Sequence, residues 1–87
     1  MEPDAEQRLM DNGHEGVKYF TNPDYAKAII GVSSDDRVVY DYLKMVECLM
    51  DDGMDETDAI EWIDYNVIGS LAYMEPGAPV ICFPLME

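Results

Sequence analysis

The chain has 87 residues, of which 48% are hydrophobic, and this size predicts one small domain with a packed core. Nineteen acidic residues face five basic ones, so the formal net charge is −14 at pH 7. This charge argues against direct binding to nucleic acids or to anionic membranes, because both need a basic surface. No apolar run reaches the roughly 20 residues of a membrane span, and the acidic, polar start is unlike a secretory signal. We therefore expect a cytoplasmic protein.

The first part of the chain shows no sustained helical or strand period, and it contains the loop-like stretch DNGHEG at 11–16. We interpret residues 1–22 as a flexible acidic N-terminal tail, or as a tail with a short frayed helix over residues 3–10. The single small domain is then expected to span residues 23–87.

The pattern changes after this segment to two β-branched and aromatic runs, 26–32 and 37–42. Four polar residues separate the runs, and this spacing predicts a β-hairpin. Strand alternation predicts shared faces for Ala28, Ile30 and Val32 in the first strand, and for Val38 and Tyr40 in the second. Gly31 weakens the first strand or marks a bulge.

Two helices are expected next. Asp41 is a predicted N-cap, Gly53 a predicted end, and Asp55 the predicted N-cap of the second helix. Helical spacing predicts apolar stripes at Tyr42, Met45, Val46, Leu49 and Met50, and at Ala59, Ile60, Ile63 and Val67. Because so few residues join them, the two helices must fold back on each other as an αα-hairpin.

The end of the chain reads as a connector over 69–79 followed by an extended apolar segment, VICFPL, at 80–85. Pro84 cannot donate a hydrogen bond to a sheet, so this segment is expected to form an edge strand. The predicted fold is α+β, with the order ββααβ: a β-hairpin packed on an αα-hairpin, with a C-terminal edge strand that can join the hairpin.

Charge is distributed unevenly along the chain. From Met45 onward there is no Lys or Arg, against ten acids. Eight of these acids fall on the two expected helices and their joint: Glu47, Asp51, Asp52, Asp55, Glu56, Asp58, Glu61 and Asp64. One interpretation is that they cap helices and keep a small protein in solution. The other is that they form a binding face for a basic partner, since carboxylates one helical turn apart, about 5.4 Å, approximate the phosphate spacing of a nucleic acid.

The sequence excludes two other interpretations of the acidic helices, an EF-hand calcium site and a helix-turn-helix DNA reader. In an EF-hand loop that starts at Asp51, Gly53 falls at the third position and Trp62 stands where a glutamate is required. A helix-turn-helix DNA reader is excluded because its second helix would carry only acids and would repel phosphates.

The remaining chemistry-bearing residues also argue against metal or catalytic chemistry. His14 is the single histidine, and it lies far in sequence from Cys48 and Cys82, so a structural zinc site or a His-based triad is not expected. The two cysteines are expected to be reduced and buried. A chain this small leaves little room for a carboxylate-paired substrate cleft, and it has no phosphate-binding glycine loop. We expect no enzyme, no cofactor and no metal.

The sequence is compatible with two roles for four aromatic residues: Trp62, Tyr65, Tyr73 and Phe83. They either belong to the core or form an exposed apolar patch that a homodimer would cover. A structural or assembly protein that associates with itself through Trp62, Tyr73 and the 80–85 strand is therefore the alternative to a basic-partner binding protein.

The stretch from Ala28 to Leu85 resembles a group of small acidic proteins found in bacterial, phage and mobile-element genomes. The resemblance lies in AIIGVSSDDRVVYDYLKMVECLMDDGMDETDAIEWIDYNVIGSL followed by GAPVICFPL, about two-thirds of the chain. No activity is established for this group, so no functional residue is carried over. By analogy of class, the resemblance implies an inhibitor of a host nucleic-acid-processing or defence protein, such as an anti-CRISPR protein.

Overall fold

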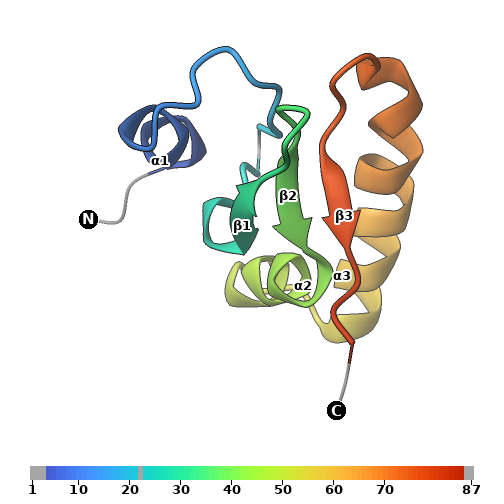
Figure 1. The fold of residues 1–87 in the computed structure, drawn as a ribbon. Helices are drawn as coiled ribbons and strands as arrows, with labels where there is room; N and C mark the ends of the chain where they lie inside the picture. Colours follow the sequence, from blue (N-terminus) through green and yellow to red (C-terminus); the bar gives the residue numbers. More distant parts are fainter. Residues whose placement is uncertain (1–3, 22, 86–87) are drawn as a thin grey trace.

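The sheet confirms the predicted β-hairpin and its third strand. The computed structural model describes residues 4–21 and 23–85, and Figure 1 shows their path. Strand β1 (Ile29–Val32) pairs antiparallel with β2 (Val38–Asp41), and β3 (Val80–Cys82) pairs parallel with β2, in the order β1-β2-β3. The C-terminal strand therefore lies at one edge and joins the hairpin, as the α+β prediction required.

Strand alternation predicted the buried face of β2 correctly and that of β1 only in part. Val38 and Tyr40 both point into the core and are 0% exposed, as predicted. In β1 the prediction is wrong for Ile30, which is 51% exposed, while Ile29 is buried beside the buried Ala28. The register shifts between Ile29 and Gly31, and this bulge turns Ile30 outward.

Helix α2 (Tyr42–Asp51) begins and ends where its capping residues predict. The Asp41 carboxylate accepts a hydrogen bond from the backbone N–H of Lys44 at 3.1 Å. At the other end Gly53 has φ = 106°, and its N–H donates to Met50 O at 3.0 Å. The N–H of Met54 donates to Leu49 O at 3.1 Å, which completes a Schellman motif and turns the chain sharply into the next helix.

Helix α3 (Glu56–Trp62) is capped by the carboxylate of Asp55, which accepts the N–H of Asp58 at 2.8 Å. The helix does not stop before the predicted connector. It continues as a π-helical segment, η2 (Ile63–Val67), and then as a 3-10 segment, η3 (Ile68–Met74). The connector is therefore shorter than predicted. Together α3, η2 and η3 form one long helical rod that lies beside β3 (Figure 1).

The buried stripes of α2 and the rod confirm most of the predicted apolar positions. Buried residues are Met45, Val46 and Leu49 in α2, and Ala59, Ile63 and Val67 in the rod. Tyr42 and Ile60 are partly buried against this core, whereas Met50 is exposed.

The N-terminal segment contains a helix close to the short frayed one that the sequence allowed, but this helix packs on the core instead of belonging to a flexible tail. Helix α1 (Ala5–Asp11) buries Ala5 and Leu9 in the core, and Phe20 is buried in the irregular segment that follows. The carboxylate of Asp24 accepts the N–H of Ala5 at 2.8 Å, which fixes the start of α1 from 19 residues away. Residues 1–3 and 22 of the predicted tail lie outside the described residues.

A cluster of three aromatic rings connects this segment to the sheet. Phe20, Tyr25 and Tyr40 pack with ring centroids 5.0 to 6.4 Å apart. Tyr25 lies just before the short 3-10 turn η1 (Ala26–Ala28), and the N–H of Phe20 donates to the Tyr40 hydroxyl at 3.0 Å. Residues 4–21 are thus part of the same core as the domain predicted for 23–87.

Within residues 4–21 and 23–85, every helix is too short or too polar to cross a membrane.

Candidate functional site

The eight predicted carboxylates all lie at the surface, on α2, on the turn that follows it, on α3 and, for Asp64, on η2. Each of these side chains is exposed, and the described part of the chain has no buried polar or charged residue. The Asp41 and Asp55 caps and the Schellman turn hold the helices that carry them. Because α2 and α3 run in different directions, the carboxylates cover two helix surfaces rather than one plane (Figure 1).

The acids at the start of α3 are explained in part by helix stability. Asp55 caps the helix, and Glu56 and Asp58 lie in its first turn, where the positive end of the helix dipole favours them. The acids at the end of α2 have the opposite effect. Asp51 and Asp52 lie at the negative end of that dipole, and the last turn of α2 holds no basic residue. Helix capping therefore accounts for some of the eight carboxylates but not for these two.

The carboxylates at the end of α2 face other parts of the chain. Asp51 and Asp52 line a surface hollow of about 340 Å³ together with Asp4, Asp24 and Lys27. A basic side chain thus contributes to the surface around this group. We separate it from the second group, Asp58, Glu61 and Asp64, which lies on the outer side of the helical rod.

Two basic residues, Arg37 and Lys18, contact the segment that leads into β3. Arg37 lies 3.1 Å from the Asp35 carboxylate and 3.3 Å from that of Glu75. Lys18 donates to the backbone oxygens of Met74 and Pro76 at 2.6 and 2.7 Å. These contacts join distant parts of the chain, and neither Asp35 nor Glu75 belongs to the eight carboxylates. The ion pairs of Arg37 therefore leave the negative charge of α3 in place.

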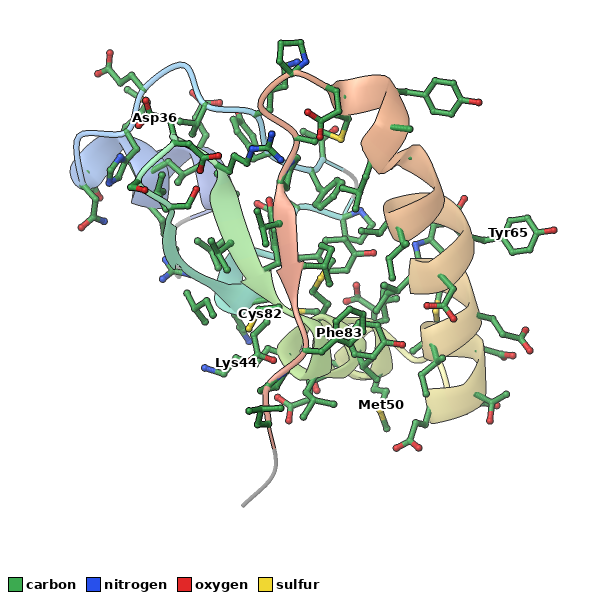
Figure 2. All side chains as sticks on the ribbon, turned by 45° about the vertical axis from the view of Figure 1, so that its right-hand side comes forward. Asp36, Lys44, Met50, Tyr65, Cys82 and Phe83 are labelled. Atoms are coloured by element: carbon green, nitrogen blue, oxygen red, sulfur yellow. The ribbon has the colours of Figure 1, made fainter. Side chains whose placement is uncertain are left out.

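The four aromatic residues with an open role are all exposed, so the core interpretation is wrong for them. Tyr65 and Tyr73 are 87% and 90% exposed, and Trp62 and Phe83 are exposed to a smaller degree. Phe83 packs against Tyr42, with ring centroids 4.7 Å apart. Figure 2 shows Tyr65 projecting from the helical rod, away from the sheet. Tyr65 therefore lies on the outer side of the rod with its carboxylates, whereas Trp62 interacts with the hydroxyl of the buried Tyr25.

The histidine and the cysteines have separate surroundings. His14 is half-buried beside a hollow of about 190 Å³ that Arg8, Asn12 and β1 also line. Cys48 and Cys82 are free thiols, half-buried rather than buried, and burial raises the pKa of Cys48. In the described ranges 4–21 and 23–85, no three His, Cys, Asp or Glu side chains are grouped in a way that could hold a metal ion.

Comparison of the chain with protein-family models, with curated proteins and with solved structures finds no match. The candidate site therefore rests on the geometry of the chain itself. Its strongest feature is the outer side of α3 and η2, where exposed carboxylates and the exposed ring of Tyr65 lie on one helical surface.

Proposed function

We propose that this chain is a non-enzymatic binding protein that presents the carboxylates of α2 and α3 to a basic protein partner. The observation that carries the proposal is that all eight carboxylates are exposed on two rigidly capped helices. Helix capping and the helix dipole account for only some of these like charges, and together the charges repel one another in the compact state. Asp51 and Asp52 even oppose the dipole of the helix that carries them.

In its sharper form, the proposal is that the carboxylates take the places of nucleic acid phosphates. The protein would then occupy the nucleic-acid-binding surface of a host nucleic-acid-processing or defence protein and inhibit it, as an anti-CRISPR protein does. Support comes from the spacing of acids on successive turns of α3, about 5.4 Å per turn, and from the resemblance to small acidic proteins of phage and mobile elements.

The test replaces three outer carboxylates by amides, Asp58→Asn, Glu61→Gln and Asp64→Asn. A control variant with the same change in net charge carries Asp11→Asn, Glu15→Gln and Asp36→Asn, all exposed and outside α2 and α3. Each protein is immobilised, exposed to nuclease-treated bacterial lysate and eluted with increasing salt. We expect the wild type and the control to retain a nucleic-acid-binding protein that duplex DNA displaces, and the α3 variant to lose it.

Retention of the same protein by the α3 variant would contradict the proposal. The expected elution also depends on salt, since contacts between exposed charges weaken as the screening length falls from about 30 Å at 0.01 M to about 8 Å at 0.15 M salt. A partner that stays bound at high salt would not be held by the carboxylates.

One observation favours a second function, self-association in a structural or assembly protein. Val80, Phe83 and Leu85 of the C-terminal segment are all exposed, as are Trp62 and Tyr73. Contact between two copies through these residues would strengthen with salt, because burial of apolar surface is not screened and the charge repulsion between copies is. Sedimentation at low and high salt separates the two functions: a dimer that forms at high salt supports the second, and a monomer at both contradicts it.

A further inference from the structure

We infer that the outer side of α3 and η2 recognises arginine rather than lysine side chains of its partner. The inference rests on the proposed function, because it names the chemistry of the partner that the carboxylates bind. It depends on three exposed residues that lie three and four positions apart in the chain: Asp58, Glu61 and Tyr65. Residues with this spacing are surface neighbours on a helix, so two carboxylates and one aromatic ring belong to the same patch.

The aromatic ring of this patch is open to a partner. Tyr65 is 87% exposed and projects outward from the rod (Figure 2). It lies in η2, where the N–H of Ile68 bonds to the oxygen of Ile63 in π-helical geometry. This segment keeps Ile63 and Val67 buried on the inner side while Tyr65 faces out. Such π-helical segments are rare in proteins and are frequently found at functional sites.

Arginine matches both kinds of group in the patch. Its planar guanidinium stacks on an aromatic face and, at the same time, donates two parallel hydrogen bonds to a carboxylate. Glu61 precedes Tyr65 by four residues, and both side chains are exposed, so one guanidinium can contact the carboxylate and the ring together. Lysine has a compact ammonium group without a stacking plane, and it would use the carboxylates alone.

The partner surface is therefore expected to present an arginine side chain to Tyr65 and Glu61. Tyr and Trp, together with Arg, are the residues that contribute most binding energy in protein interfaces. An acidic face that serves only for solubility has no need of an exposed ring beside its charges, and exposed rings reduce solubility.

The experiment compares an oligoarginine peptide with an oligolysine peptide of equal length by isothermal titration calorimetry with the intact protein. We expect the arginine peptide to bind roughly threefold to tenfold more tightly, the range that a cation–π contact supplies. Tyr65→Leu should bring the ratio of the two affinities close to one, because leucine keeps an apolar side chain but removes the ring. The matched control is Tyr73→Leu, which removes an equally exposed tyrosine whose preceding turn holds Gly69 and Ser70 instead of acids. It should leave the ratio unchanged.

The outcomes separate this inference from the proposed function. Equal affinities of the wild type for both peptides, or the same loss in Tyr73→Leu as in Tyr65→Leu, would overturn the arginine preference while peptide binding through the carboxylates stands. Binding of neither peptide, or binding that the Asp58, Glu61 and Asp64 amide variant leaves intact, would overturn the proposed function and this inference with it. Because Tyr65 is almost fully exposed, its replacement should not impair folding, and circular dichroism of each variant verifies this.

Discussion

Tyr40 is the residue through which the N-terminal segment, the sheet and the aromatic cluster meet. Its side chain is fully buried, and its hydroxyl accepts the N–H of Phe20. Burial raises the pKa of Tyr40 to about 12 from its ordinary value of 10.0. Burial also raises the pKa of Tyr25, so the cluster as a whole resists ionisation.

This shift predicts a loss of stability in alkali. Between about pH 10 and pH 12, the unfolded chain has lost the Tyr40 proton that the folded chain keeps, so the unfolded state binds fewer protons. The free energy of unfolding should therefore fall as the pH rises through this window, by about 2–3 kcal/mol for Tyr40 alone. Urea unfolding on both sides of the window measures the fall. Tyr40→Phe should show a smaller fall, and an unchanged slope in this variant would contradict the assignment to Tyr40.

Leu9 tests whether the N-terminal helix belongs to the core. It is buried against the core, while the neighbouring Met10 is exposed. Leu9→Ala should lower the free energy of unfolding by about 2–4 kcal/mol, because it leaves a cavity, and Met10→Ala by less than about 0.5 kcal/mol. Chemical denaturation of both variants measures the difference. Similar small effects for the two would support the flexible tail predicted from the sequence.

Single residues also show where prediction from sequence succeeds and where it stops. Asp41, Asp55 and Gly53 were predicted correctly because each acts on backbone groups within a few residues of itself. Asp24, in contrast, fixes the start of α1 from 19 residues away, and no local pattern carries that information. Helix α1 presents only Ala5 and Leu9 to the core, a stripe too short to be recognised as a helical period.

The turn between α2 and α3 should be sensitive to substitution of its glycine. Gly53 has φ = 106°, a backbone conformation that residues with a Cβ rarely adopt. Gly53→Ala should lower the free energy of unfolding by about 1 kcal/mol or more. The matched control is Gly31→Ala in β1, where a Cβ would meet open space and φ is not positive. Its effect should lie within about 0.5 kcal/mol of zero, and equal losses in the two variants would contradict the argument from φ.

The helical rod shows how the candidate site could be predicted only in part. The eight carboxylates were predicted to be exposed because they alternate with buried apolar positions, and all of them are. The sequence left Tyr65 and Tyr73 open between the core and an exposed patch, and it placed Tyr73 in a connector and not in a helical segment. The π-helical and 3-10 segments change the number of residues per turn, so a fixed helical period does not predict which side these rings occupy.

The whole molecule has a net charge of −14, and its like charges oppose the compact state. Salt screens this repulsion, so the midpoint of thermal unfolding should rise as NaCl increases from about 0.01 to 0.15 M. The same salt should weaken binding to a basic partner. The variant with Asp58, Glu61 and Asp64 replaced by amides should respond less to NaCl, because it carries fewer like charges. A midpoint that does not move with salt would show that the charges are too far apart to repel one another.

The strands at the two edges of the sheet determine whether a strand from another molecule can pair with it. The bulge at Ile29 and Gly31 lies in the pairing of β1 with β2, and Pro79 and Pro84 flank β3 with backbone nitrogens that carry no hydrogen. Bulges and prolines near sheet edges disfavour the addition of a further strand. Crowded copies of the chain are therefore expected to resist edge-to-edge pairing of their sheets.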